Sequence, residues 1–505
     1  MVLEHLEPRH VWRIFERVLV ATPRESKKEE KVRAAVLEWL SSEVASRGVR
    51  LKTTVDSTGN LLISVPATRG MESCPTVMLQ GHLDMVCETN RPHGFDFQNL
   101  PIPVRIQDNG EWVDADGTTL GADNGIGVAL ALGLLVDDDP GLAHGPLEIL
   151  LTVDEETGLT GAFGLDVKAM SLQSKYLINI DSEELGLLTI GSAGGGDIQL
   201  DREVSQHPPP KDYAFYALSV SGLLGGHSGM EIVNPRANAN KLVARMLSSL
   251  IRDVPIMLSS WHGGSKHNAI PRDSVAVFCV RKRDTGRMEE ILKAERDAIL
   301  SYYRSMVKNA MVLEPEMVVE WKQASPSTCM STEESAIIVR TANALPHGYR
   351  NFSPEVAGLV ETSCNFAIVR SEDRRVSLRL SVRSSVDSEL SAYRYSIADM
   401  AELAGWSVEM SPAYPGWKPE PNSPFLQFVR KHYEEVLGSE VRMEAIHAGL
   451  ECGIIGAKMP GIQMVSLGPT AKNAHTPDER LRIADVGIVY RVLKAVLRDL
   501  PRLES

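Results

Sequence analysis

The sequence has little cysteine, no long apolar run and no concentration of positive charge. Its six cysteines are far apart in 505 residues and form no C-x-x-C pair. This spacing argues against a disulfide framework or a thiolate zinc site and favours a reducing, cytoplasmic location. No stretch reaches about 18 uncharged apolar residues, and the charged start MVLEHLEPRHVWRIFER is unlike a signal peptide. We therefore expect neither a secreted disulfide scaffold nor a membrane protein.

The charge balance is acidic, with 53 Lys and Arg against 66 Asp and Glu and a net charge of -13. No segment gathers the Lys and Arg side chains that would release counterions from a phosphate backbone, so we expect no nucleic-acid partner. An acidic chain attracts metal cations, although solubility alone accounts equally well for the charge.

The length predicts two or three domains, and the first of them has an α/β pattern. Helical periodicity covers residues 6–21, 28–48 and 125–136, while NLLISV, TVMLQ, LEILLTV and KYLINI are typical of strands. Strands that alternate with helices predict a mixed, largely parallel sheet with helices on both of its faces.

A glycine-rich break at residues 191–197 ends this pattern, and an α+β pattern follows. It contains strand-like runs and expected helices at Pro235–Ile251 and from Thr285 to Lys308, then a second set of similar length over residues 333–410. The likeness of the two sets is one of pattern alone and suggests an internal duplication. Helix 424–437 and strand IQMVSL then return to the α/β pattern. We therefore predict an α/β domain made of residues 1–190 and 414–505, with an α+β lid domain, residues 191–413, inserted between them.

Polar residues follow the predicted strands of the α/β domain. Because ligands of open α/β sheets bind beyond the carboxyl ends of the strands, we expect these side chains to meet at one edge. The residues are His82 and Asp84 after TVMLQ, Glu155 and Glu156 after LEILLTV, Asp181 after KYLINI, His475 beyond IQMVSL, and Asp123 at the start of a helix.

Two histidines and several carboxylates, with no cysteine, form a set of nitrogen and oxygen ligands that suits Zn, Co or Mn. The set exceeds the needs of one ion and fits two divalent ions bridged by a carboxylate. Asp84 is placed to accept the second N–H of His82 and so orient the ring. Glu155 neighbours a ligand and is placed to take a proton from water.

Each of these residues also has an interpretation without function. A histidine in a loop is usually a surface residue, the DEE run could cap a helix or face solvent, Asp123 is a natural N-cap, and Asp181 could begin a turn. The placement of all five segments at predicted strand or helix ends favours a shared site.

The same segments carry a family resemblance. GHLDMV, GADNGIG, DEETGLTGA, NIDSEE and NAHTPDERL resemble the signatures of the co-catalytic di-zinc metallopeptidases, which include aminoacylases, carboxypeptidases and cytosolic dipeptidases. GGHSGMEI, NAIPRD and AGLECGII are similar to the aminoacyl-histidine (carnosine-type) dipeptidases. The resemblance implies that His82 and Asp181 bind one zinc ion and Glu156 and His475 the other. Asp123 would bridge the ions, Asp84 would orient His82, and Glu155 would be the general base.

The resemblance also implies roles for residues of the lid domain and a homodimer formed through it. His227 and Asn268 would support the oxyanion, and Arg383 would bind the carboxylate of a dipeptide. His447 and Glu451 are candidates near the substrate. A glycine-rich turn, a loop before a strand and a surface arginine are the ordinary alternatives. Lys472 departs from the family pattern, because it puts a cation close to the expected metals.

The function expected from these residues is hydrolysis of dipeptides, with aminoacyl-histidine and β-alanyl-histidine as the substrate class. A related amidohydrolase, a tripeptidase or a dipeptidase of broad specificity on the same scaffold is the alternative. A metal- and peptide-binding protein without turnover is a third hypothesis. Glu155 argues against that hypothesis, because a protein that only binds peptides does not need a general base.

Overall fold

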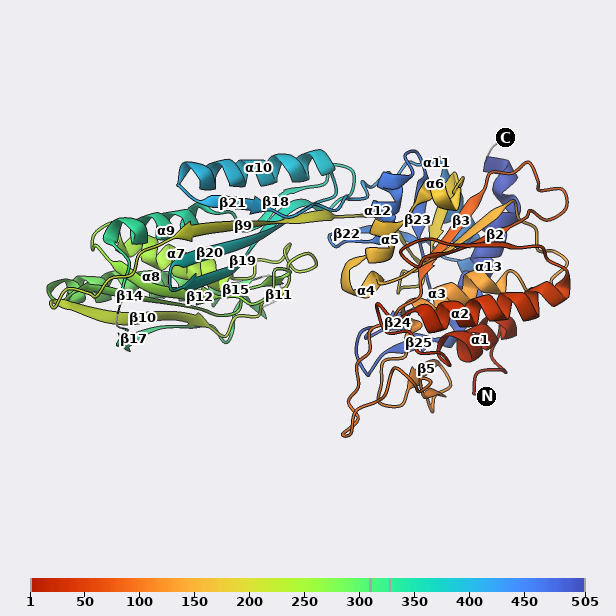
Figure 1. The fold of residues 1–505 in the computed structure, drawn as a ribbon, viewed down its shortest axis with the longest axis horizontal. Helices are drawn as coiled ribbons and strands as arrows, with labels where there is room; N and C mark the ends of the chain where they lie inside the picture. The colour runs from red at the N-terminus through yellow and green to blue at the C-terminus, as the bar shows by residue number, and fades with distance from the viewer. Residues whose placement is uncertain (1, 308–310, 327, 504–505) are drawn as a thin grey trace. The chain divides into compact units, whose positions relative to one another are not determined.

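The computed structural model describes residues 2–307, 311–326 and 328–503, which form two compact units (Figure 1). The first, here called the α/β unit, comprises Met1–Gly191, Trp417–Ala445 and Leu450–Ser505. The second, here called the α+β unit, comprises Ser192–Gly416 and Ile446–Gly449. Both ends of the chain therefore belong to the α/β unit.

An eight-stranded sheet with the order β1-β2-β6-β3-β7-β23-β8-β22 forms the centre of the α/β unit. Its four middle strands, β6, β3, β7 and β23, are parallel, while β1, β2 and β8 pair antiparallel with their neighbours. This mixed sheet confirms the predicted α/β class. The strands are β1 (Lys52–Val55), β2 (Leu61–Val65), β3 (Val77–His82), β6 (Leu147–Thr152), β7 (Tyr176–Asn179), β8 (Leu187–Ser192), β22 (Arg442–Ile446) and β23 (Gln463–Ser466).

Helices pack on both faces of this sheet. The side of β3 that carries Met78 shares a buried apolar cluster with α5, α6 and α12, and α3 packs against the other side at Gly81. The helices are α1 (Arg9–Ile14), α2 (Glu30–Trp39), α3 (Ala122–Gly133), α4 (Glu155–Gly158), α5 (Thr160–Gly164), α6 (Val167–Met170), α11 (Pro424–Leu437), α12 (Glu451–Lys458) and α13 (Ile483–Asp499). The expected helices at 6–21 and 28–48 are present, but they contain π-helix at Phe15–Leu19 and Leu40–Val44, and the second ends in a 3-10 turn at Ala45–Arg47.

A small four-stranded sheet of order β24-β25-β5-β4 also belongs to the α/β unit. β4 (Val104–Ile106) and β5 (Trp112–Ala115) come from the first half of the chain, and β24 (Ala471–Lys472) and β25 (Arg480–Arg482) from its end. Because β25 pairs with β5, the loop between β24 and β25 is tied to the segment that precedes α3.

The α+β unit contains one continuous nine-stranded sheet, in which β18 pairs with β19 beside the order β17-β10-β14-β12-β19-β20-β9-β21. The two similar sets expected from the sequence are therefore halves of a single sheet. Its strands and those of two small ribbons are β9 (Gly194–Glu203), β10 (Tyr213–Ser221), β11 (Gly226–His227), β12 (Met257–Gly263), β13 (Ala269–Ile270), β14 (Ser274–Arg281), β15 (Met306–Val307), β16 (Met311–Val312), β17 (Val318–Ala324), β18 (Gly348–Phe352), β19 (Val360–Glu372), β20 (Arg375–Ser384) and β21 (Ser407–Met410).

Four helices pack with this sheet in one apolar core: α7 (Ala239–Leu250), α8 (Thr285–Tyr303), α9 (Thr332–Ala344) and α10 (Asp387–Leu403). α10 lies along β9 and β21 (Figure 1). The prediction that a helix starts at Pro235 was wrong by four residues, because Asn238 caps α7 by accepting the N–H of Lys241 at 3.1 Å. Lys308, the expected end of α8, lies outside the described residues.

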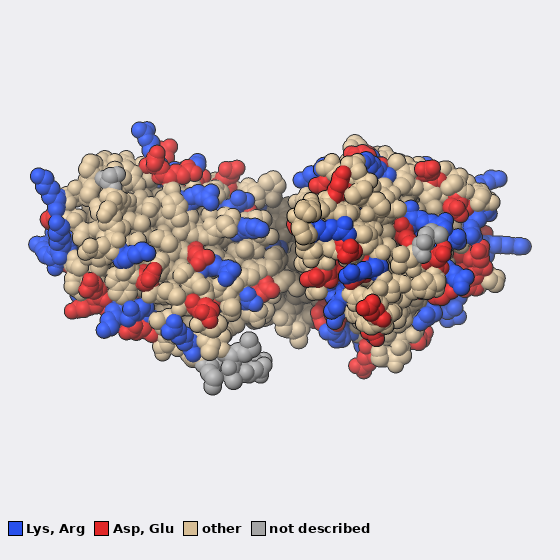
Figure 2. Space-filling model, turned by 90° about the horizontal axis from the view of Figure 1, so that it is seen from below, with Lys and Arg blue, Asp and Glu red and all other residues tan. Residues whose placement is uncertain are grey.

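Within the described residues, every helix is too short or too polar to cross a bilayer. On the face of the molecule drawn in Figure 2, acidic and basic side chains are interspersed.

The packing of α3 against the end of β7 gives a test of the fold. A Cβ on the buried Gly127 would collide with the backbone carbonyl of Ile180, whereas a Cβ on Gly286 of α8 would meet nothing within 4 Å. We expect Gly127→Ala to lower the free energy of unfolding by about 1–3 kcal/mol. Gly286→Ala should change it by less than about 0.5 kcal/mol. Denaturant unfolding of both variants measures the difference, and equal stabilities would contradict this packing.

Candidate metal centre

The polar residues expected to meet at one edge of the sheet do meet there. His82 is the last residue of β3, Asp181 follows β7 by two residues, and Glu155 and Glu156 begin α4 just after β6. His475 lies in the loop between β24 and β25, nine residues after β23. Four parallel strands thus deliver side chains to their common carboxyl end, where Asp123 joins them from the start of α3.

Asp123 occupies the middle of this cluster. Its Oδ1 lies 2.9 Å from His82 Nε2, and its Oδ2 lies 3.1 Å from His475 Nε2. Asp181 Oδ1 is 3.4 Å from His82 Nε2, and Glu156 Oε2 is 2.9 Å from His475 Nε2. Three groups of three residues have donor atoms within 4.8 Å of one another. Two of the groups share the Asp123 carboxylate, and the third consists of His82, Glu155 and Glu156.

The structure does not show Asp123 or the glutamates of the DEE run as helix caps. Gly121 is the N-cap of α3, and no side chain caps that end, so the carboxylate of Asp123 is free to face the histidines. Before α4, the side chain of Asp154 accepts the hydroxyls of Thr157 and Thr160. Glu156 does not cap α4, and its Oε2 lies 2.9 Å from His475 Nε2.

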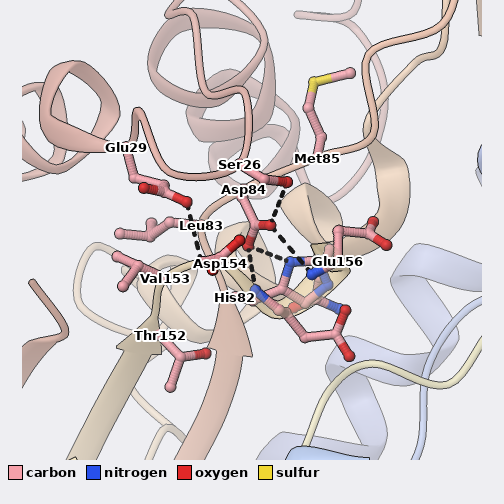
Figure 3. Close-up of polar contacts among 12 residues, drawn as sticks. Ser26, Glu29, His82, Leu83, Asp84, Met85, Thr152, Val153, Asp154 and Glu156 are labelled. Carbon is pink, nitrogen blue, oxygen red and sulfur yellow. Dashed lines mark hydrogen bonds and ion pairs between the residues drawn. The ribbon is translucent and has the colours of Figure 1, made fainter. Parts of the chain in front are cut away.

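Asp84 connects the imidazole of His82 with the loop of the two glutamates (Figure 3). Its Oδ1 lies 3.2 Å from His82 Nδ1, and its carboxylate accepts the N–H groups of Glu155 at 3.0 Å and Glu156 at 3.2 Å. Ser26 donates a further hydrogen bond at 2.7 Å. Burial would raise the pKa of Asp84, but His82, Ser26 and the Glu155 amide lower it to about 2. The carboxylate is therefore charged and lies within ion-pair distance of the ring.

The other acids of the cluster carry excess negative charge. Burial raises the pKa of Glu155 well above its usual value, and it raises the pKa of Asp181 to about 6 although His82 opposes the shift. Hydrogen bonds to Asp123 and Glu156 raise the pKa of His475 to about 11. The centre therefore attracts positive charge strongly.

The donor set fits divalent metal ions. It consists of imidazole nitrogens and carboxylate oxygens, and no cysteine is among them. Glu156 Oε1 is buried and has no hydrogen-bond partner among the described residues, which leaves a carboxylate oxygen available for a cation.

The sequence analysis did not identify two buried residues behind this centre. The carboxylate of Glu479 accepts backbone N–H groups of the segment that ends at Asp123, and Arg24 donates to carbonyl oxygens of Leu83 and Asp84. Glu479 stands in the quoted motif NAHTPDERL, but its partners are about 356 positions away in the sequence. A single sequence contains no signal for such a contact.

Lys472, the cation that departs from the family pattern, contacts an aromatic ring. Its Nζ lies 5.7 Å from the centre of the Trp112 ring, and Arg480 lies over the same ring at 4.9 Å. Both cations thus stack on an aromatic side chain of the small sheet.

Four of the residues expected to bind substrate, His227, Asn268, Arg383 and His447, belong to the α+β unit. His227 and Asn268 line a cavity of about 630 Å³. The buried Arg383 donates to the Tyr414 hydroxyl at 3.1 Å, and the buried His447 pairs with Ser363 Oγ at 2.7 Å. Arg383 Nε and His447 Nδ1 have no partner in the described parts of the chain. Burial and the charge of Arg383 lower the pKa of His447 to about 3.

Glu451, the fifth residue, belongs to the α/β unit and begins α12. Its Oε2 accepts hydrogen bonds from Gln80 at 2.5 Å and from Thr152 at 2.8 Å, whereas its buried Oε1 has no partner among the residues described. Burial raises the pKa of this carboxyl to about 7. One oxygen is therefore free to accept a hydrogen bond from a ligand.

Comparison with known proteins places this arrangement in a family. The chain is 36% identical over 499 residues to the cytosol non-specific dipeptidase of Escherichia coli (strain K12), with 99% of each chain covered. It is similar to the crystal structure of aminoacylhistidine dipeptidase from Vibrio alginolyticus, with a TM-score of 0.88, 36% identity and 98% of each chain covered. A tripeptidase from Staphylococcus aureus shares the fold at 16% identity, with a TM-score of 0.53 over 98% of this chain and 99% of that one. Residues 78–499 match the model of peptidase family M20/M25/M40, and the chain therefore belongs to this family.

Proposed function

We propose that the protein is a metal-dependent dipeptidase whose preferred substrates have a C-terminal histidine, β-alanyl-histidine included. The observation that carries the proposal is that two groups of possible ligands, one with His82 and Asp181 and the other with Glu156 and His475, share Asp123. Family membership and the names of two relatives that are 36% identical over nearly the whole chain support it. The name of the Escherichia coli relative also supports a cytoplasmic location.

The two sets suit two divalent ions, with zinc as the proposed native metal and Co or Mn as substitutes. The distances support one ion held by His82 and Asp181 and a second held by Glu156 and His475. Asp123 would contribute one oxygen to each ion. Asp84 would act through His82, by holding the ring and its tautomer in place.

When bound, the two ions would supply Lewis acidity, which lowers the pKa of a water molecule and polarises the scissile carbonyl. Glu155 adjoins Glu156 at the start of α4 and belongs to neither of the two groups that share Asp123. It would take the proton of the attacking water and then give it to the departing amine. The peptide C–N bond breaks, and the addition of one water molecule gives a carboxylic acid and an amine.

The α+β unit offers donors that suit an anionic group. Arg383 Nε is a buried N–H without a partner among the described residues, and such a donor gains from a carboxylate acceptor. His447 Nδ1 is likewise buried and unpartnered in the described chain, and it is a donor when the ring carries its proton on that nitrogen. We assign Arg383 and His447 to the C-terminal carboxylate of the dipeptide, and His227 and Asn268 to the developing oxyanion. The homodimer expected through this unit stays a prediction.

Glu451, considered within the α/β unit alone, suits the amino terminus of a dipeptide. Its free oxygen is a buried acceptor, and the free α-ammonium group of a peptide is a donor that carries the complementary charge. An N-acylated amino acid lacks this ammonium. Glu451 therefore favours a dipeptidase over the alternative of an amidohydrolase that acts on N-acyl amino acids.

The first prediction concerns the reaction itself. The protein, after dialysis against EDTA, should lose activity and regain it with Zn, Mn or Co. With metal, it should hydrolyse Ala-His and β-Ala-His faster than Leu-Gly-Gly or N-acetyl amino acids. Amine release, followed by steady-state kinetics, measures each rate. Hydrolysis of only the tripeptide or the acylated compounds would support the alternatives, and no hydrolysis with any metal would exclude an enzyme.

The second prediction separates the base from the ligands. Glu155→Gln should retain both ions and lower kcat by about 100- to 10,000-fold, because the amide accepts no proton. His475→Ala should retain only one ion, because it removes a donor from one set. Metal analysis by mass spectrometry together with kcat tests both variants. Loss of both ions from Glu155→Gln would show that Glu155 is a ligand instead.

The third prediction tests the role of Glu451 at the amino terminus. Glu451→Gln should raise KM for Ala-His more than it changes kcat, and it should narrow the preference for Ala-His over N-acetylated substrates. Glu148→Gln is the matched control. Glu148 is a buried carboxylate as well, but it lies on β6, at the end of that strand opposite to Thr152. An unchanged preference in Glu451→Gln would remove the residue from the substrate site.

A further inference from the structure

The buried carboxylate of Glu479 holds the backbone that carries Asp123. Only 2% of Glu479 is exposed. Its Oε2 accepts the N–H groups of Leu120 at 2.7 Å and Gly121 at 2.8 Å, and its Oε1 accepts those of Ala122 at 2.7 Å and Asp123 at 3.3 Å. Four consecutive backbone amides thus converge on one side chain, and all of its strong acceptor positions are used.

The same residue belongs to the loop that carries His475. This loop joins β24 to β25, and the N–H of Glu479 donates to the carbonyl of Thr476 at 3.0 Å. Immediately after Glu479, β25 pairs with β5 through Arg480 and Asp114. One short segment therefore connects a histidine of the centre to the backbone of the shared aspartate.

A second buried residue holds the same backbone from the other side. Arg24 Nη1 donates to the carbonyls of Leu83 at 3.1 Å and Asp84 at 3.0 Å, and its Nη2 donates to the carbonyl of Gly121. Gly121 has φ +70°, and a Cβ there would collide with the Arg24 guanidinium, so the close contact requires glycine. Arg24 thus ties the shared aspartate to the end of β3, where His82 lies.

We propose that Glu479 is a positioning residue that sets the distance between Asp123 and His475 and thereby the affinity of the ion held by Glu156 and His475. The inference rests on the proposed function, because it takes these residues as ligands. Glu479 touches no substrate and binds no metal; it acts through the backbone amides of Leu120–Asp123. Arg24 fixes the same segment relative to His82, so loss of Glu479 should loosen one set of ligands and leave the other in place.

Glu148 provides a matched control for the structural effect of removing a buried carboxylate. It is 6% exposed and accepts the backbone N–H groups of Gln173 at 2.9 Å and Ser174 at 3.2 Å. It lies at the amino end of β6, whereas the metal centre lies beyond the carboxyl ends of the parallel strands. Both variants lose the same kind of interaction, but only one of them loses it beside Asp123.

The experiment compares Glu479→Gln, Glu479→Asp and Glu148→Gln with the parent protein by titration with Zn²⁺ and Co²⁺ and by metal analysis. In Glu479→Gln, the amide NH₂ replaces an acceptor and faces two backbone donors. The affinity for one ion should therefore fall by about 10- to 100-fold while the other ion stays bound. Glu479→Asp keeps both acceptor oxygens but shortens the side chain by one methylene, so it should lower the affinity for the same ion, although by less than Glu479→Gln does. Glu148→Gln should lower the thermal midpoint of unfolding but keep both ions.

Two results would overturn the inference while the proposed function stands. One is a parent protein with two ions and a Glu479→Gln variant that binds both with parental affinity. The other is a Glu148→Gln variant that loses the same ion to the same extent, which would show general loosening of the fold. A parent protein that binds fewer than two ions contradicts the proposed function itself, and the inference with it. If Glu479→Gln does not fold, the Glu479→Asp variant decides, and parental affinity for both ions in it together with an unchanged Co²⁺ spectrum would count against the inference.

Discussion

Repulsion among carboxylates at one end of a parallel sheet is the constraint on which the α/β unit depends. Asp123, Glu156 and Asp181 lie within a few ångströms of two histidines, and Glu155 stands next to them. Burial makes each negative charge more costly than it is in water. The raised pKa values of Glu155 and Asp181 express this cost. A cluster of this kind is stable in its charged form only when cations share it, so the fold and the need for metal are linked.

The buried acids of the α/β unit differ in whether backbone N–H groups donate to their oxygens. Asp84 and Glu479 accept backbone N–H groups on their oxygens, which compensates their charge and makes them rigid. Glu156 Oε1 and Glu451 Oε1 are equally buried but have no such donors in the described chain. Acids of the first kind accept backbone N–H groups, and those of the second kind have acceptors left for a ligand. This difference is the basis for proposing the first kind as positioning acids and the second kind as binding acids, although all of them are buried.

The sequence alone predicted the sheet and the main residues of the centre, because both depend on local patterns. Strand periodicity located β3, β6, β7 and β23, and the polar residues after them followed from the geometry of parallel sheets. Contacts between distant segments that do not follow from strand ends were not predictable from one sequence. Glu479 binds a segment more than 350 residues away, and Lys472 stacks on Trp112 across an equally long separation. The single continuous sheet of the α+β unit was missed for the same reason, because pairing of its two halves leaves no local pattern.

The structure explains the arrangement of the metal centre more fully than it explains substrate preference. The ligands of the centre are fixed by sheet topology, and a tripeptidase at 16% identity retains the same fold. Preference must therefore come from side chains outside this framework. Single unpartnered polar atoms are weak indicators of such residues, since Asn240 Oδ1 and Ser228 Oγ are also buried without partners among the described residues. Arg383 and His447 differ from them, because the charge of Arg383 acts on His447 and helps to lower its pKa. This combination of unpartnered atoms and electrostatic influence, rather than burial alone, is the reason for proposing the two residues as binding groups.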